Sequence, residues 1–237
     1  MKSKNRTFPI RLVFPHPLAA DFRGLLALGG DLNVQRLILA YRFGIFPWYS
    51  EGQPIQWYAP RQRFVIDVGR VHVPKSMRRY LNNKLFTISV DEHFEYIIDQ
   101  CQQIPRSGQA GTWITPELKN AFIELHEMGL AHSVEVWKGN DIVGGLYGLG
   151  LGRIFSGESM FSFVSDSSKF AIIVLDKILN TLGYKFIDCQ QETPHIKLMG
   201  GYSLPNTVYH EHIRKNLFEK LSYQKWSPEL VHRALSS

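Results

Sequence analysis

The sequence has little cysteine and no long apolar run. Cys101 and Cys189 are the only two cysteines in 237 residues, and they form neither a CxxC pair nor a metal-type spacing. A disulfide framework is therefore excluded, and a reducing cytoplasm is favoured. No run of 18 apolar residues occurs, so we expect no membrane span. Arg11 and three prolines interrupt the apolar part of the N-terminal segment, which disfavours a signal peptide.

The common nucleotide, metal and hydrolase motifs are also missing. The segment GGLYGLGLG (144–152) holds no GKS or GKT and leads into a predicted strand, so we interpret its glycines as serving turns or close backbone approach. There is no HExxH, and His210 and His212 lie two apart in a polar segment. We therefore expect no metal site. A GxSxG elbow is absent too. Its absence does not exclude a Ser-His-Asp triad, because such triads also occur without that motif.

The charge is unevenly distributed. The chain carries a formal net charge of +6, yet residues 1–84 hold 14 Lys and Arg against 4 Asp and Glu, a net of +10. The remainder holds 13 against 17, a net of −4. A basic third of this kind indicates a polyanionic partner such as nucleic acid or anionic lipid, or else a solvated surface.

The pattern of apolar residues predicts a mixed α/β protein with a largely antiparallel sheet. Helices are predicted over 34–43, 75–84, 92–103, from Thr115 to Gly129, and over 167–183; strands are predicted over 64–68, 133–137, 142–149, 153–162 and 184–189.

Capping residues support three of these helices. Asp31 or Asn33 is expected to cap the first, with Gly44 at its end. Asp91 is expected to cap the helix over 92–103, and the Thr115-Pro116-Glu117 run is a strong helix start.

Three polar residues lie where strands are predicted. Glu158 interrupts an apolar strand, so it is either an edge carboxylate in water or part of a pocket for a cation. Asp188 and Gln190 end another strand and share one face of it, as candidates either for a site or for a cap or turn. Cys189 would face the other side, as a core thiol.

A series of ordered segments resembles the leucyl/phenylalanyl-tRNA–protein transferase family. The segments are GLLALGGDL (24–32), AYRFGIFPWYS (40–50), GTWIT (111–115), LHEMGLAHSVEVW (125–137), GGLYG (144–148), FSGESMFS (155–162), SSKFA (167–171) and IDCQ (187–190). One departure is WYAPRQR (57–63), where the family tends to have WWSP followed by Asp-Pro-Arg.

The resemblance implies an aminoacyltransferase that moves Leu or Phe from charged tRNA to the α-amino group of proteins beginning with Arg or Lys. The product is marked for degradation under the N-end rule, and neither a cofactor nor a metal is consumed. The implied fold is α+β, with a small N-terminal α/β domain (1–63) packed on a C-terminal acyltransferase domain (64–237) similar to the GNAT superfamily. A cytoplasmic monomer with no membrane partner is expected.

The resemblance also implies roles for individual residues. Asp188 and Gln190 match the proposed catalytic pair, and we expect Asp188 to orient and polarise Gln190, which positions the attacking amine. Glu158 matches the acid assigned to the cationic acceptor N-terminus. The remaining positions are Trp48 and Trp113 for the terminal adenosine, Leu146, Phe155 and Ile187 for the transferred side chain, and Lys75, Arg78, Arg79 and Lys84 for the tRNA acceptor stem.

Two other functions compete with this one. An acyl-coenzyme A-dependent N-acyltransferase of the same superfamily would need a pyrophosphate-binding loop before the helix over 167–183, and SFVSDSS (162–168) lacks that chemistry. A noncatalytic RNA-binding protein would explain the basic third, but it would leave Glu158, Asp188 and Gln190 without a shared purpose.

Overall fold

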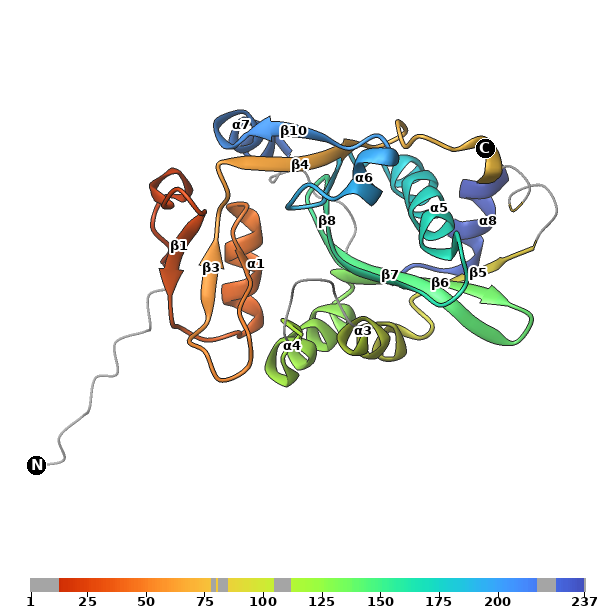
Figure 1. The fold of residues 1–237 in the computed structure, drawn as a ribbon, viewed down its shortest axis with the longest axis horizontal. Coiled ribbons are helices and arrows are strands. Elements are labelled where there is room, and N and C mark those ends of the chain that lie inside the picture. Colours follow the sequence, from red (N-terminus) through yellow and green to blue (C-terminus); the bar gives the residue numbers. More distant parts are fainter. Residues whose placement is uncertain (1–12, 78–79, 81–84, 105–111, 217–224, 237) are drawn as a thin grey trace, which may run out of the picture.

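The computed structural model describes residues 13–77, 80, 85–104, 112–216 and 225–236. Figure 1 shows a small layer formed by the N-terminal part of the chain, packed beside a larger sheet that carries helices on both faces.

The N-terminal layer contains a three-stranded antiparallel sheet and one helix. The strands are β1 (Leu25–Leu28), β2 (Phe46–Pro47) and β3 (Gln56–Tyr58), in the order β1-β3-β2, after a short 3-10 turn η1 (Pro17–Ala19). Helix α1 (Val34–Arg42) begins at Asn33, whose side chain accepts from the Arg36 backbone N–H, and a left-handed Gly44 follows its end. Both capping predictions for this helix are confirmed.

The larger sheet has seven strands in the order β10-β4-β9-β8-β7-β6-β5. Their bounds are β4 (Gln62–Asp67), β5 (Thr87–Val90), β6 (Ala131–Lys138), β7 (Asp141–Leu151), β8 (Ile154–Ser162), β9 (Phe186–Asp188) and β10 (Tyr202–Pro205). Every neighbouring pair is antiparallel except β8 and β9, which run parallel because helix α5 (Ser167–Leu182) connects them. The prediction of a mixed α/β chain with a largely antiparallel sheet is confirmed.

Helices cover both faces of this sheet (Figure 1). Helices α3 (Phe94–Gln103) and α4 (Pro116–Glu127) pack on one face, while α5 and α8 (Pro228–Ser236) pack on the other. The 3-10 turn η2 (Lys75–Met77), α6 (Pro194–Leu198) and α7 (Asn206–Asn216) complete the described elements. The start of α4 at Thr115 is confirmed, since the Thr115 hydroxyl accepts from the Leu118 backbone N–H.

The predicted cap at Asp91 is wrong. Helix α3 starts at Phe94, and the Asp91 carboxylate is occupied by distant groups: the His132 ring at 2.8 Å, the Ser133 N–H at 2.9 Å and the Trp226 N–H at 2.7 Å. Asp91 has a positive φ of 57°, so its side chain is directed toward strand β6 instead of its own helix.

Two glycines of β7 serve close packing, as their interpretation predicts. A Cβ on Gly144 would lie 2.3 Å from the Ser167 hydroxyl at the start of α5, and one on Gly148 would lie 2.3 Å from the Ser156 carbonyl of β8. Any larger residue would therefore push α5 or β8 away from β7.

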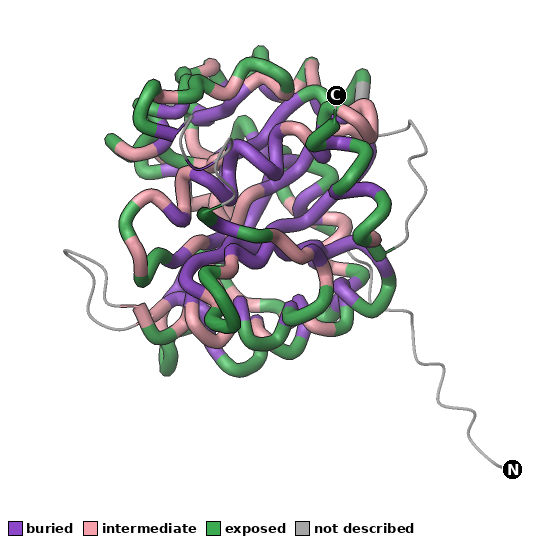
Figure 2. Tube along the Cα trace, turned by 90° about the vertical axis from the view of Figure 1, so that its right-hand side faces the viewer, coloured by how far each residue is buried: buried purple, intermediate pink, exposed green. Residues whose placement is uncertain are grey.

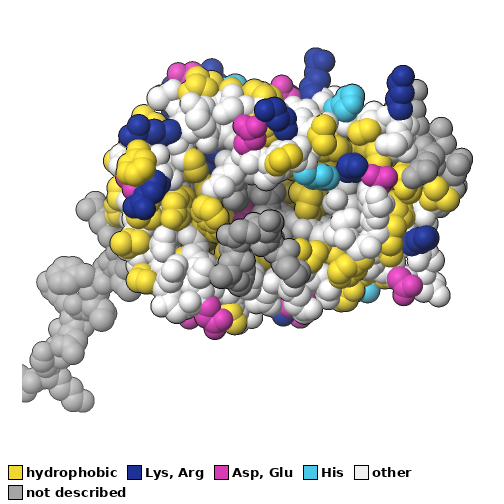
Figure 3. Space-filling model, viewed as in Figure 1, with side chains coloured by type: hydrophobic (Ala, Val, Ile, Leu, Met, Phe, Trp, Pro, Cys, Tyr) yellow, Lys and Arg dark blue, Asp and Glu magenta, His cyan; other side chains and the backbone are white. Residues whose placement is uncertain are grey.

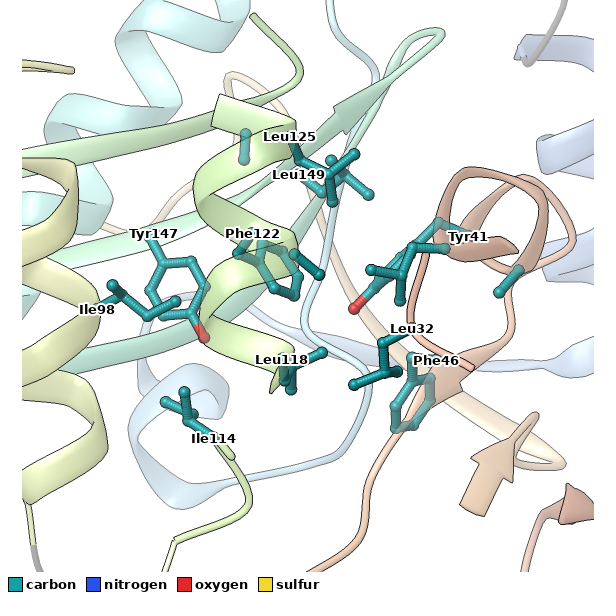
Figure 4. Packing of buried hydrophobic residues seen from close by; sticks show 14 of the residues in the cluster. Leu32, Tyr41, Phe46, Ile98, Ile114, Leu118, Phe122, Leu125, Tyr147 and Leu149 are labelled. Carbon is teal, nitrogen blue, oxygen red and sulfur yellow. The ribbon is translucent and has the colours of Figure 1, made fainter. Parts of the chain in front are cut away.

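The core joins the N-terminal layer to the larger sheet. Tyr41 of α1 meets Phe122 of α4 edge to face at 6.3 Å, and Phe122 meets Tyr147 of β7 in the same way at 5.4 Å (Figure 4). Figure 2 shows that buried residues run through the middle of the molecule and that exposed ones lie on its outer turns. The N-terminal layer is thereby fixed against the part of the sheet that carries the site.

Candidate functional site

A cavity of about 580 Å³ lies between the sheet and α5. Most of its lining is apolar and comes from β4, β7, β8, β9, α5 and the start of α6; it includes Ile66, Leu146, Met160, Ile172, Leu175, Ile187 and Ile196. Figure 3 shows hydrophobic side chains around a hollow near the centre of one face of the molecule. A space of this size and lining suits an apolar group with few polar contacts.

Glu158 lies in the cavity wall at an irregular point of β8. Tyr147 pairs with Ser159 and Gly148 pairs with Gly157, so Glu158 has no partner on β7 and forms a β-bulge. Bulges redirect a side chain and are frequent beside active sites. Because β8 is a central strand, Glu158 is not an edge carboxylate, and it lines the cavity instead. That this pocket binds a cation stays a prediction.

The side chain of Gln190 is bound to that carboxylate. Gln190 Nε2 donates to Glu158 Oε1 at 2.9 Å, which brings together two residues 32 positions apart. Burial raises the pKa of Glu158 to about 8, and the nearby negative charge of Asp188 acts in the same direction. The Glu158 carboxyl therefore exchanges a proton close to the pH at which an α-amino group does.

Asp188 is completely buried, and its oxygens accept from Arg63 Nε at 2.7 Å, Arg63 Nη2 at 2.5 Å, the Tyr209 hydroxyl at 2.6 Å and the Gln190 backbone N–H at 2.9 Å. An ionised carboxylate has about four acceptor positions, and four donors occupy them here. Asp188 thus accepts from the backbone of Gln190, as an orienting residue would, whereas the side-chain amide of Gln190 donates to Glu158. Polarisation of that amide by Asp188 stays a prediction.

The sequence interpretation missed Arg63, Tyr209 and Tyr41. Arg63 is only 1% exposed, although Arg is rarely buried without a partner. An Arg within the apolar strand β4 was the available signal, but its partner becomes evident only when β4 pairs with β9. Tyr41 of α1 reaches toward the site from the N-terminal layer; its buried hydroxyl forms no hydrogen bond within the described part of the chain, but its proximity to Glu158 lowers the pKa of that carboxyl against the effect of burial.

Two of the three residues expected to line an acyl pocket lie in the cavity wall. Leu146 and Ile187 line the cavity. Phe155 pairs with Ile187 across β8 and β9, but it is completely buried and its ring lies 5.9 Å from that of Trp226, outside the lining. Phe155 thus lies behind the residues that line the cavity, and its expected role in the acyl pocket stays a prediction. Cys189 packs against the hydrophobic core, as expected, and it also lines the cavity; burial raises the pKa of its thiol.

The two tryptophans expected at the adenosine lie on neighbouring segments. The Tyr49 hydroxyl and Thr115 Oγ1 are 3.0 Å apart, which joins the segment of Trp48 to that of Trp113. Trp48 is 37% exposed and available for stacking, whereas Trp113 is 6% exposed. Of the four expected tRNA contacts, Lys75 is exposed in η2, while Arg78, Arg79 and Lys84 lie outside the described residues.

Comparisons with known proteins identify the family of the chain. Residues 65–214 match the model of the leucyl/phenylalanyl-tRNA protein transferase family, and residues 30–61 match the model of its N-terminal domain. Within the described residues, no cluster of His, Cys, Asp and Glu suits a metal ion, and no helix has the length and apolar character needed to cross a bilayer.

Several curated relatives carry the name leucyl/phenylalanyl-tRNA–protein transferase. The relative from Syntrophus aciditrophicus is 47% identical over 91% of this chain and 90% of its own length, and that from Myxococcus xanthus is 42% identical over 91% and 92%. The relative from Flavobacterium johnsoniae is 50% identical over 80% and 89%. The solved structure of L-PGS from Bacillus licheniformis covers 65% of this chain and 50% of its own at 11% identity, with a TM-score of 0.39. The resemblance seen in the sequence is thus confirmed, and the chain belongs to the leucyl/phenylalanyl-tRNA–protein transferase family.

Proposed function

We propose that Glu158, Gln190 and the cavity beside them perform the reaction of this aminoacyltransferase, the transfer of Leu or Phe from charged tRNA to the amino group of a protein that begins with Arg or Lys. The observation that carries the proposal is the hydrogen bond between Gln190 Nε2 and Glu158 Oε1 at the wall of an apolar cavity. It places a proton acceptor and an amide beside a space that fits a hydrophobic side chain.

The cavity binds the transferred side chain. Leu146, Met160 and Ile187 offer an apolar wall without a polar group specific for one residue type. Leu and Phe differ in shape but not in polarity, and such a wall separates apolar side chains by only about 1–3 kcal/mol. One cavity therefore accepts both.

Glu158 and Gln190 act on the attacking amine. Because Gln190 Nε2 donates to Glu158, the amide oxygen of Gln190 remains to accept from an N–H of the incoming amine. The ammonium form cannot attack, and a carboxylate whose pKa lies near that of the amine is suited to take its proton. The amine nitrogen then attacks the ester carbonyl carbon, the bond to the ribose oxygen breaks, and that oxygen takes up a proton.

Asp188 supports this reaction without touching the substrate. Its acceptor positions are filled by Arg63, Tyr209 and the Gln190 backbone. Its contribution is to fix the position of Gln190, and orientation of this kind is a large part of the rate when an ester is already activated.

The tRNA lies along the basic third of the chain. Trp48 and Trp113 bind the terminal adenosine, and the exposed ring of Trp48 offers the better stacking surface. Lys75, Arg78, Arg79 and Lys84 contact phosphates of the acceptor stem, and such contacts carry little sequence information. That property suits an enzyme that uses several tRNAs.

The larger sheet is a GNAT-like acyltransferase domain over 64–237, packed on a small domain over 1–63. The antiparallel run β6-β7-β8, the crossover through α5 and the parallel pairing of β9 support this assignment. The enzyme works as a cytoplasmic monomer without a cofactor. Coenzyme A is disfavoured because the Asp166 carboxylate lies directly before α5, where a pyrophosphate would bind.

Radiolabelled Leu or Phe on tRNA tests the function directly. Transfer to a peptide starting with Arg, and little transfer to one starting with Ala, is expected. Product formation from an acyl-coenzyme A but not from Phe-tRNA would replace the proposal with the coenzyme A reaction.

A further inference from the structure

A buried cluster behind the site joins four separate parts of the chain. Its centre is the Arg63–Asp188 pair, in which Arg63 is 1% and Asp188 0% exposed. Arg63 Nη1 also donates to the Gly44 carbonyl at 3.1 Å, and its guanidinium lies 4.7 Å from the Phe46 ring centre and 5.0 Å from that of Tyr209. The N-terminal layer, β4, β9 and α7 thus meet at one guanidinium.

The cluster fixes the backbone conformation of Gln190. This residue has a positive φ of 63°, a left-handed conformation that is unfavourable for a residue with a side chain. The Asp188 carboxylate holds it there through the Gln190 backbone N–H, and the Phe64 N–H donates to the Gln190 carbonyl at 3.4 Å. Phe64 directly follows Arg63, so β4 holds Gln190 in two ways: directly through the Phe64 N–H, and indirectly through the Arg63 guanidinium, which binds Asp188.

From this geometry we propose that Arg63 and Tyr209 are positioning residues of the transferase: they fix Asp188, and thereby hold Gln190 in the left-handed conformation that places its amide on Glu158. The inference rests on the proposed function, because it needs Gln190 at the reacting amine. Neither residue touches the substrate, since both lie behind Asp188.

Arg63 fits this task better than Lys would. Its planar fork donates from Nε and Nη2 to the two carboxylate oxygens and from Nη1 to Gly44 at the same time. A lysine ammonium keeps the charge but cannot make this set of contacts. Arg63→Lys therefore loosens Asp188 without leaving it beside an uncharged group.

The test combines Arg63→Lys with Gln190→Gly. In single-turnover transfer from Phe-tRNA to an Arg-initiated peptide, Arg63→Lys is expected to lower the rate about tenfold or more while the peptide KM stays near that of the wild type. In the Gln190→Gly background, where no side chain remains to be positioned, Arg63→Lys is expected to change the rate less than twofold. Arg36→Lys is the matched control, because Arg36 makes the same two-pronged contact with Asp31 at 3.0 and 3.1 Å on α1.

Tyr209→Phe provides a second variant that keeps the ring in the core and removes one donor to Asp188. It is expected to lower the rate by several-fold, with the loss again absent in the Gln190→Gly background. A further readout is the pH profile, because the groups that face Glu158 are Tyr41 of α1, Arg63 of β4, and Asp188 and Gln190 at the end of β9. Loosening Gln190 should move the Glu158-dependent limb to higher pH.

Three outcomes would overturn the inference. If Arg63→Lys and Tyr209→Phe both keep the wild-type rate, positioning through Asp188 is wrong. If they slow transfer equally with and without the Gln190 side chain, their role is purely structural. If Gln190→Gly itself keeps the full rate, the proposed site fails along with this inference, which separates that case from the first two.

Discussion

Gln190 donates from its side chain to Glu158 at 2.9 Å and from its backbone to Asp188 at 2.9 Å, so one residue connects a carboxyl in the cavity wall to a carboxylate buried behind it. The two acids have separate tasks as a result. Glu158 faces the cavity and exchanges a proton near neutral pH, whereas Asp188 is saturated by donors and holds the geometry.

The pH dependence of transfer should identify Glu158. Its raised pKa of about 8 means that the carboxyl is neutral in more acidic solution and becomes a proton acceptor as the pH rises through 8. The acceptor amine loses its own proton at a pKa of about 7.7–8.0. In wild type, the carboxylate takes the proton of the ammonium, so the reactive pair has lost one proton in all and kcat/KM for the peptide should rise and then fall around pH 8. In Glu158→Gln only the amine titrates, so kcat/KM should rise with one proton lost and then level off. Profiles of the same shape in both proteins would contradict the role of Glu158.

The same residue should lower stability at high pH. A carboxyl whose pKa is raised by folding favours the folded state below its unfolded pKa of about 4.5, and this contribution is lost as the pH rises through about 8. Glu158→Gln should therefore raise the midpoint of thermal unfolding at pH 9 relative to wild type and change it less at pH 5. A difference that is the same at both pH values would show that the Glu158 carboxyl titrates normally.

Breaking the Arg63–Asp188 pair should destabilise the fold strongly. Arg63→Met leaves a buried carboxylate without its cation, which costs about 3–5 kcal/mol in the free energy of unfolding. Replacing both partners, Arg63→Met with Asp188→Leu, should recover most of this loss. Denaturant unfolding measures both variants, and Arg36→Met is the control, because its partner Asp31 is 47% exposed and such pairs contribute only about 0–1 kcal/mol. A cost for Arg63→Met as small as that of the control would show that the pair is not desolvated.

Residues of the cavity wall should set the preference between Leu and Phe. Leu146 lines the cavity beside Met160, its partner in the β7–β8 register, so Leu146→Phe fills space that the larger substrate needs. We expect the ratio of transfer from Phe-tRNA to that from Leu-tRNA to fall about 10-fold or more. Phe155→Leu, behind the wall, should lower stability by about 1–2 kcal/mol and leave the ratio unchanged. A larger change of the ratio for Phe155→Leu than for Leu146→Phe would place Phe155 in the acyl pocket, as the family resemblance implies.

The local parts of the fold follow from the sequence, and the long-range parts do not. The starts of α1 and α4 could be predicted because Asn33 and Thr115 bind backbone groups three residues ahead. The same logic failed for Asp91, whose partners are His132, Ser133 and Trp226. Nothing local distinguishes a carboxylate that caps its own helix from one that ties down a segment far along the chain.

The residues of the site also fall into two groups, those that the sequence predicts and those that depend on long-range contacts. Glu158, Asp188 and Gln190 stand out as polar residues in apolar strands, and the family resemblance groups them. The division of work between them depends on Arg63, 125 positions from Asp188, and on Tyr209. Residue spacing predicts that Cys189 packs against the core, which is confirmed. It does not predict that the strand ends at Asp188 and that the chain turns at Gln190, so that the thiol also lines the cavity.

The basic segment over residues 75–84 should contribute to the affinity for tRNA. Arg78→Ala with Arg79→Ala removes two candidate phosphate contacts, so the slope of log affinity against log salt should become shallower by about 1–2. The dissociation constant for Phe-tRNA, measured at one pH from about 50 to about 300 mM salt, checks this prediction. Lys119→Ala is the control, because Lys119 of α4 already forms an ion pair with Asp99 of α3 at 2.5 Å. A salt slope equal to that of wild type would make the basic segment a solvated surface.

The most direct test of the central claim is single-turnover transfer by Gln190→Gly. Glycine adopts the left-handed backbone at this position without strain, so the variant removes the amide and leaves the chain path intact. We predict that the rate of Phe transfer from tRNA to an Arg-initiated peptide falls about 10- to 100-fold, while the affinity for Phe-tRNA stays the same. A wild-type rate would contradict the claim that Gln190, held on Glu158, positions the attacking amine.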